Sequence, residues 1–329
     1  MSQPAVVDDN VDVKSTLDHI IPFILFHHVA HERSFSPSSS SSTSSFPVHS
    51  PPPPLLIGLN GPQGIGKSTL AALLAVTLAA PPYDLPTVVL SIDDFYLPRP
   101  ALAALAAAHP TNALLRVRGQ PGTHDVPLLL SVLTRLLHRP DTITSLDPLR
   151  LPRYDKAAHG GLGDRIPPSQ WCALADAPRL VLLEGWCVGF RALGRRAVAA
   201  RHAAAAATSS VRRHALDDLL FVDGQLAAAD GYARAWDLCG ALVHLDAADT
   251  AWVYEWRREQ EAALRAARGA GAGMTDEEVN AFVDAYYPAY DLYTDRLRRG
   301  TFREGEGASG RHLRLVMGRD RTVRERIVI

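Results

Sequence analysis

Hydrophobic positions along the chain fall into short continuous runs that alternate with longer segments of helical periodicity. The continuous runs predict strands at residues 55–59, 87–92, 179–183, 241–245 and 312–317. Runs without polar alternation are typical of strands buried on both faces, as in a parallel sheet. Between them, the apolar spacing predicts helices near residues 67–79, 126–138, 212–229, 249–267 and 275–298. This alternation predicts an α/β fold with a mainly parallel, roughly five-stranded sheet that helices cover on both faces.

The segment ahead of the first strand has two parts. Residues 11–32 carry apolar side chains on one helical stripe, so residues 1–33 are expected to supply a helix that packs on the main domain. Residues 34–54 hold a serine run and a proline run. Such a composition has too little apolar surface to order itself, and a flexible linker is expected there. The main domain is expected over residues 55–329, with an Ala- and Arg-rich insertion at residues 192–216 that is either helical or flexible.

Composition argues against several classes of protein. The 329 residues are 47% hydrophobic with a formal net charge of −1, so the chain can bury a large core but has no basic field for nucleic acid. Its three cysteines form no Cys-x-x-Cys pair, which argues against a disulfide framework or a zinc site and favours a reducing compartment. No apolar run reaches the ~18 residues of a membrane span. The acidic N-terminal segment fits neither a signal nor a transit peptide. A cytoplasmic location is expected, with a nuclear one also left open.

The clearest motif begins directly after the first predicted strand. Residues 61–69 read Gly-Pro-Gln-Gly-Ile-Gly-Lys-Ser-Thr, a full match to the phosphate-binding pattern G-x-x-x-x-G-K-[ST], and a predicted helix follows. Backbone N–H groups of such a loop point at a polyphosphate, Lys67 would reach the β- and γ-phosphates, and the Ser68 hydroxyl would ligate Mg²⁺. The motif predicts a nucleotide site without indicating how the nucleotide is used. Its residues are Gly61, Pro62, Gln63, Gly64, Ile65, Gly66, Lys67, Ser68 and Thr69.

Acidic residues follow the next two predicted strands. Asp93 and Asp94 come at the end of the run at 87–92, and Glu184 follows the run at 179–183. The carboxyl ends of parallel strands meet at one edge of the sheet, which places these carboxylates beside the phosphate loop. There Asp93 can accept a proton from an attacking hydroxyl or hold Mg²⁺ through water, while Asp94 is expected to be structural. Glu184 is expected on the metal side, like a Walker-B acid. Two simpler interpretations stay open: one acid of the pair caps the next element, and Glu184 is incidental.

Two loops carry the residues that are expected to bind an acceptor molecule. Arg118 precedes a turn in which Asp125 is predicted to cap the following helix, so the arginine is available for an anion. The second loop, rich in glycine, spans residues 151–165, and long loops inside compact domains are commonly functional. Because a guanidinium binds a carboxylate through two hydrogen bonds, a small polar acid is the expected ligand. The expected acceptor-site residues are Asp93, Tyr96, Arg118, Arg153, Tyr154 and Lys156.

A third basic segment lies in the helix predicted after the fourth strand. Arg257 and Arg258 are adjacent there. Two interpretations stay open: a solvated helix surface, or a mobile lid whose arginines neutralise transition-state charge and exclude water. Farther along, residues 282–293 carry aromatic side chains at helical spacing, with a break of the helix expected at Pro288. Core packing is expected for these side chains, and a contact with the substrate is the alternative.

Taken together, the motifs resemble those of one known family. In chain order they are G-P-Q-G-I-G-K-S-T, S-I-D-D-F-Y, R-G-Q-P-G-T-H-D, L-P-R-Y-D-K, G-D-R, L-E-G-W-C-V-G-F, W-R-R-E-Q-E and F-V-D-A-Y-Y-P-A-Y. This order resembles the D-glycerate 3-kinase family, which includes plant-type glycerate kinases and a fungal ATP-dependent kinase. That family belongs to the P-loop kinase superfamily, with uridine kinase, phosphoribulokinase and pantothenate kinase. The likeness covers residues 11–32 and 55–318.

The resemblance implies a P-loop NTPase-type three-layer sandwich with a helical lid, acting as a monomer with ATP and Mg²⁺. Asp93 matches the catalytic acid of the superfamily, and Glu184 matches the acid on the Mg²⁺ side. Arg257 and Arg258 match the lid region and, with Lys67, are expected to absorb developing charge.

The activity implied is transfer of the γ-phosphate of MgATP to a hydroxyl of D-glycerate, giving 3-phosphoglycerate, or of a similar small metabolite. Two alternatives stay open. One is a nucleoside or sugar kinase of the uridine kinase–phosphoribulokinase type. The other is a nucleotide-binding regulatory protein without a small-molecule acceptor. No nucleic-acid or membrane partner is expected.

Overall fold

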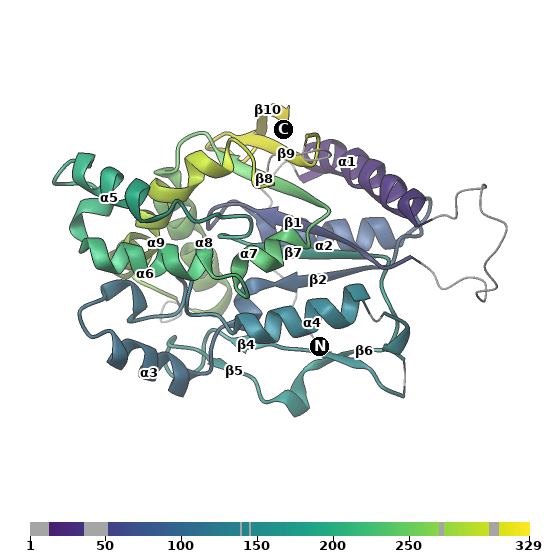
Figure 1. Ribbon diagram of the computed structural model, residues 1–329, viewed down its shortest axis with the longest axis horizontal. Coiled ribbons are helices and arrows are strands. Elements are labelled where there is room, and N and C mark those ends of the chain that lie inside the picture. Colours follow the sequence, from purple (N-terminus) through teal and green to yellow (C-terminus); the bar gives the residue numbers. More distant parts are fainter. Residues whose placement is uncertain (1–12, 36–51, 139, 145, 270–272, 303–308) are drawn as a thin grey trace.

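A mostly parallel sheet forms the centre of the computed structural model, which describes residues 13–35, 52–138, 140–144, 146–269, 273–302 and 309–329. Its six strands lie in the order β10-β9-β8-β1-β7-β2, and every neighbouring pair is parallel except β9 with β10 (Figure 1). The α/β fold and the mainly parallel sheet predicted from the sequence are confirmed. The bounds are β1 (Leu55–Asn60), β2 (Thr87–Ser91), β7 (Leu180–Gly185), β8 (Ala241–Ala247), β9 (His312–Met317) and β10 (Val323–Val328).

The parallel strands are those that the apolar runs predict, and their burial explains why. Every residue of β1, β7 and β8 is buried, so each of these strands must be apolar on both faces. The sequence did not predict β10, which pairs with β9 at the edge of the sheet and reads Val-Arg-Glu-Arg-Ile-Val. All of its side chains are partly or fully exposed, so an edge strand of this kind leaves no apolar run to recognise.

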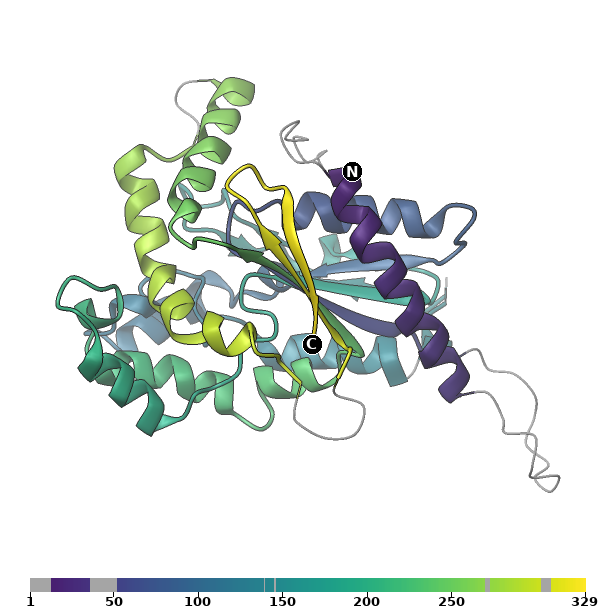
Figure 2. The same ribbon diagram turned by 90° about the horizontal axis from the view of Figure 1, so that it is seen from above.

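Helices cover both faces of the sheet, as the alternating pattern predicts. One face is covered by α1 and α2, which pack against each other, and the other by α4 and α7 (Figure 2). Beyond the ends of the strands, α8 and α9 pack as a pair, and α5 packs with α6 (Figure 2). The bounds are α1 (Val13–Ser34), α2 (Lys67–Ala79), α3 (Arg99–Ala108), α4 (Val126–His138), α5 (Arg195–Ala204), α6 (Leu216–Ala227), α7 (Tyr232–Asp237), α8 (Trp252–Arg268) and α9 (Asp276–Leu297).

The predicted break of the last helix at Pro288 is wrong, because α9 continues through this residue. A proline inside a helix removes one hydrogen bond and crowds the preceding turn. The aromatic stripe compensates, since Tyr286, Tyr290 and Tyr293 are all buried. Tyr286 and Tyr290 pack edge-on against Trp186. Tertiary packing of one face therefore outweighs the local cost of the proline.

The structure describes only part of the segments that lie outside the alternating strands and helices. Of the expected linker, residues 36–51 lie outside the described residues. The segment at 192–216 contains α5 and is therefore partly helical. Across the described parts of the chain, no helix combines the length and the apolar character that crossing a membrane would require.

Candidate active site

The phosphate-loop motif lies between β1 and α2, where two glycines shape the turn. Gly64 and Gly66 have φ angles of 80° and 96°, in the left-handed region that side chains rarely adopt. A Cβ atom at Gly64 would lie 2.5 Å from Cβ of Trp256, so no side chain fits there. The first N–H groups of α2 have no acceptors within the helix, and they make the loop suited to an anion.

Two side chains of the loop meet an acid from the neighbouring strand. The Ser68 hydroxyl donates to Oε1 of Glu184 at 3.1 Å, and Glu184 lies near the carboxyl end of β7. The Lys67 ammonium is buried and donates to the Pro62 carbonyl at 2.9 Å. Burial lowers the pKa of Lys67, while the charges of Glu184 and Asp93 oppose this shift. The structure thus brings the lysine together with Ser68 and Glu184, two of the three residues that were expected at the metal; Asp93, the third, acts on Lys67 through its charge.

The Ser68–Glu184 pair has the chemistry that a magnesium ion requires. Hydroxyl and carboxylate oxygens are its preferred ligands, and the ion usually keeps several waters and phosphate oxygens as well. No group of three or more His, Cys, Asp or Glu residues within the described parts of the chain could hold a metal by itself. An ion at this position would therefore complete its shell with nucleotide phosphates and water.

Asp93 lies in the short 3₁₀ turn (Ile92–Phe95) that follows β2. Its Oδ1 atom accepts a hydrogen bond from the Tyr96 hydroxyl at 3.0 Å, and its Oδ2 atom accepts one from Nζ of Lys156 at 2.5 Å. Burial alone would raise the pKa of Asp93, but the ammonium of Lys156, His124 and the two hydrogen bonds lower it to about 2. The carboxylate is therefore ionised at neutral pH.

Asp94 has a different set of partners from its neighbour. Its Oδ2 atom accepts from Nη1 of Arg153 at 2.9 Å, and its Oδ1 atom accepts from the backbone N–H of Tyr154 at 3.0 Å. The acid thereby ties the turn after β2 to the strand β4 (Tyr154–Asp155), which carries the second loop. The two adjacent carboxylates thus have separate surroundings. Arg153, expected at the acceptor, is paired with Asp94.

Arg118 also donates its hydrogen bonds within the protein. Its Nη1 atom donates to the carbonyls of Gly161 and Leu162 at 2.8 and 2.6 Å, and its Nη2 atom donates to that of Lys156 at 3.3 Å. Its guanidinium also lies over the ring of Tyr154. These contacts hold the glycine-rich loop in the position from which Lys156 reaches Asp93.

Arg165 is a further organising residue, and the sequence reasoning gave it no role. It lies in β5 (Asp164–Arg165), which pairs with β4. Its Nη1 atom donates to Oδ2 of Asp125 at 2.9 Å, and its Nε and Nη2 atoms donate to the Tyr96 carbonyl. The predicted cap of α4 is present, since Oδ1 of Asp125 accepts the N–H of Leu128. The G-D-R motif contains this arginine, but the sequence alone does not indicate which acid an arginine in a loop will pair with.

The two candidate lid arginines lie on α8 and contact groups of the α8–α9 pair. Arg257 pairs with Glu261 one turn away and lies over the ring of Phe282. Arg258 donates to Oδ1 of Asn280 on α9 at 2.7 Å. Both arginines therefore link the two helices, and a phosphate role for either one remains a prediction.

A buried arginine from the C-terminal hairpin supports the phosphate loop, and no motif pointed to it. Arg321 lies in the turn between β9 and β10 with a φ of 59° and is 3% exposed. Its Nε atom donates to the Gly64 carbonyl at 2.9 Å, and its Nη2 atom pairs with Glu259 of α8 at 2.5 Å. The guanidinium also lies over the ring of Trp256. One side chain thus joins the phosphate loop, α8 and the last hairpin.

Replacing Arg321 with alanine is expected to weaken ATP binding about tenfold, because a hydrogen bond from a charged donor that shapes the loop is lost. Titration of a non-hydrolysable ATP analogue measures this change. Arg324→Ala is the matched control, since Arg324 lies in the same hairpin and pairs only at the surface with Asp320. Equal affinities in the Arg321→Ala variant and the unchanged protein would contradict the supporting role.

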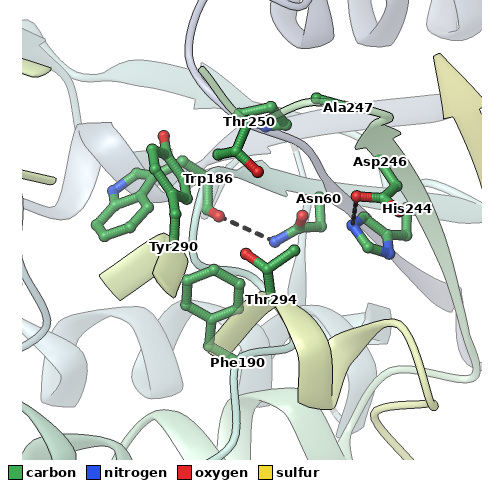
Figure 3. A pocket seen from close by; sticks show the side chains of 10 residues that line it. Asn60, Trp186, Phe190, His244, Asp246, Ala247, Thr250, Tyr290 and Thr294 are labelled. Carbon is green, nitrogen blue, oxygen red and sulfur yellow. Dashed lines mark hydrogen bonds and ion pairs between the residues drawn. The ribbon is translucent and has the colours of Figure 1, made fainter. Parts of the chain in front are cut away.

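A small cavity lies next to the start of the phosphate loop, between the ends of β1 and β8 and the helix α9 (Figure 3). The Asn60 amide donates to the carbonyls of Trp186 and Val188 at 2.9 and 2.7 Å, which ties the end of β1 to the segment after Glu184. These two hydrogen bonds hold the end of β1, where the phosphate loop begins, against the segment that follows Glu184. Its lining comprises Asn60, Pro62, Trp186, Phe190, His244, Asp246, Ala247, Thr250, Tyr290 and Thr294.

Comparison with known proteins places this site in a family. No family model matches the chain. The kinase mug58 of Schizosaccharomyces pombe is 38% identical over 245 residues, which are 74% of this chain and 82% of that protein. The chloroplastic D-glycerate 3-kinase of Arabidopsis thaliana is 36% identical over 263 residues, 78% of this chain but only 50% of the plant protein.

A solved structure is similar to this chain as well. The D-glycerate 3-kinase of Cryptococcus neoformans superposes with a TM-score of 0.80 at 29% identity, covering 95% of this chain and 99% of that one. The sequence motifs, the sheet topology and the fungal relatives lead to the same assignment. The chain belongs to the family of ATP-dependent P-loop kinases that includes D-glycerate 3-kinase.

Proposed function

We propose that this kinase transfers the γ-phosphoryl group of ATP to the 3-hydroxyl of D-glycerate. The observation that carries the proposal is the position of an ionised carboxylate, Asp93, beside the buried Lys67 of the phosphate loop and the cationic Lys156. A site for a small acid needs a cation for the carboxylate and an acceptor for the reacting hydroxyl. The names of the plant relative and of the fungal structural neighbour support this substrate.

In the proposed reaction, Asp93 accepts the hydrogen bond of the attacking hydroxyl and receives its proton as the new O–P bond forms. The bond from the γ-phosphorus to the bridging oxygen breaks, and ADP departs with that electron pair. A carboxylate with a pKa of about 2 is a weak base. It therefore acts mainly by orienting the hydroxyl, which suits a loose transition state that needs little deprotonation.

The remaining groups stabilise charge. Lys67 would contact the transferred phosphoryl oxygens, and the N–H groups at the start of α2 would surround the phosphates. Ser68 and Glu184 would hold the magnesium ion, which neutralises phosphate charge when bound. Lys156, held by the loop that Arg118 organises, faces Asp93 and is the cation that we assign to the acceptor carboxylate.

A coupled assay of ADP release tests the function. D-Glycerate is expected to stimulate release far more than ribose, uridine or pantothenate at equal concentration. Stimulation by uridine or ribose instead would replace D-glycerate with a nucleoside or sugar acceptor. ATP binding without stimulation by any acceptor would leave only a nucleotide-binding regulatory role.

A further inference from the structure

His124 lies against the proposed acceptor site, and neither the motif reasoning nor the proposed reaction gives it a role. It precedes α4 in the turn that follows Arg118, and it is 4% exposed. Its ring stacks on that of Tyr96, with centroids 4.4 Å apart and planes inclined by 22°. The Tyr96 hydroxyl in turn donates to Asp93. The imidazole therefore packs against the residue that contacts the candidate catalytic carboxylate.

The hydrogen bonds of Tyr232 determine which nitrogen of His124 carries the proton. The Tyr232 oxygen accepts the Gly122 N–H at 2.9 Å and lies 2.7 Å from Nδ1 of His124. Tyr232 is buried, and its own proton needs an acceptor, which Nδ1 provides. Burial lowers the pKa of His124 to about 4, although Asp93 opposes this shift, so the ring is neutral at pH 7. A neutral ring that accepts at Nδ1 carries its proton on Nε2.

This Nε2–H group has no hydrogen-bond partner within the described residues, although it is buried. Two other buried polar atoms of the described residues also have no partner: Nε1 of Trp186 and the hydroxyl of Tyr154. The Tyr154 ring packs edge-on against Tyr96, and Trp186 packs against Tyr286. An unpaired buried polar group costs free energy, so the Nε2–H of a ring that stacks on Tyr96, next to Asp93, is suited to a polar ligand.

We propose that His124 is a specificity-determining residue whose Nε2–H donates a hydrogen bond to the carboxylate of the acceptor. This inference rests on the proposed function and adds a recognition residue to it. The reacting hydroxyl of the substrate must face Asp93, which accepts hydrogen bonds. The carboxylate of the substrate must therefore be bound by hydrogen-bond donors. Arg118 and Arg153 donate to protein groups, whereas the imidazole N–H has no acceptor among the residues that the structure describes. The substrate class is a short hydroxy acid.

The test compares three substitutions of His124 that keep different parts of the ring. Glutamine can place its amide N–H near the position of Nε2, asparagine reaches only the Nδ1 position beside Tyr232, and phenylalanine fills the volume without a donor. We expect His124→Asn and His124→Phe to raise KM for D-glycerate about 10- to 100-fold, the size of a lost hydrogen bond to a charged group. His124→Gln should stay within about threefold, and KM for ATP should stay within about twofold in all three.

The controls separate recognition from a purely structural role and from failure of the proposed function. Glycerol, which lacks the carboxylate, should lose no kcat/KM in the asparagine and phenylalanine variants. Equal losses with glycerol and D-glycerate, or a parallel rise of KM for ATP, would make His124 a packing residue and overturn the inference. Unchanged KM for D-glycerate in both variants would overturn it while leaving the proposed function intact. If the unchanged protein does not phosphorylate D-glycerate at all, the proposed function and this inference fail together.

Discussion

Replacing Asp93 with asparagine is expected to lower kcat about 1,000-fold while ATP binds nearly as well as before. The amide cannot receive the proton of the acceptor hydroxyl, and it no longer presents the charge that Lys156 contacts at Oδ2. The phosphate loop and the Ser68–Glu184 pair are left in place, so the nucleotide site stays assembled. The ADP-release assay measures kcat, and titration of a non-hydrolysable ATP analogue measures nucleotide binding.

Two neighbouring acids provide matched controls for this experiment. Asp155→Asn keeps the Oδ1 atom that accepts the Ala157 N–H and is expected to change kcat less than twofold. Asp94→Asn weakens the link to Arg153 and should act mainly on KM for the acceptor, because the second loop loses an anchor. Normal turnover by the Asp93→Asn variant would remove Asp93 from the mechanism.

Lowering the pH from 7 to 5 is expected to reduce the free energy of unfolding by about 4 kcal/mol through two buried histidines alone. His244 on β8 and His312 on β9 have ring centroids 5.6 Å apart and are almost fully buried. Burial lowers the pKa of each to about 3, and the nearby Arg314 adds to the effect, while Asp246 partly opposes it at His312. Both rings therefore stay neutral in the folded protein at pH 5.

The sign follows from proton binding in the two states. The unfolded chain takes up protons on these histidines below a pKa of 6.5, whereas the folded protein does so only near 3. Their stabilising contribution is therefore complete above pH 6.5 and falls as the pH drops toward 3. In that window the contribution of each histidine to the free energy of unfolding falls by about 1.4 kcal/mol per pH unit. Between pH 7 and pH 5 this amounts to about 2 kcal/mol for each histidine.

Urea unfolding at several pH values between 5 and 7 measures this slope. A His312→Gln variant should lose about one histidine's share of the slope, whatever its stability at pH 7. His138→Gln, an exposed ring on α4, controls for the substitution itself. A slope that does not change when His312 is replaced would show that this pair does not cause the loss of stability in acid.

The strands and most helices could be predicted because burial on both sides leaves continuous apolar runs. The segment at 241–247 is an example, since all its residues are buried and its run marks β8 even though it contains His244 and Asp246. The edge strand β10 and the persistence of α9 through Pro288 could not be predicted, because both depend on neighbours from elsewhere in the chain. The local hydrophobic pattern indicates that a segment is buried, but it does not indicate which distant part of the chain packs against that segment.

The candidate site also contains some residues whose contacts could be predicted from the sequence and others whose contacts could not. The proximity of Lys67, Ser68, Asp93 and Glu184 could be predicted because short motifs tie them to strand ends, and parallel strand ends meet. For the arginines the sequence showed only charge. Arg153 pairs with Asp94, which is far from it in the sequence, and Arg321 reaches the loop from the opposite end of the chain.

The contact between Arg321 and the Gly64 carbonyl has a consequence for biosynthesis. The β9–β10 turn comes later in chain order than every strand of the sheet except β10, yet it braces the loop just after the first strand. While the ribosome is still translating, the emerging polypeptide can form β1 and α2 but lacks this brace. Nascent chains should therefore gain full affinity for ATP only after the hairpin has left the exit tunnel.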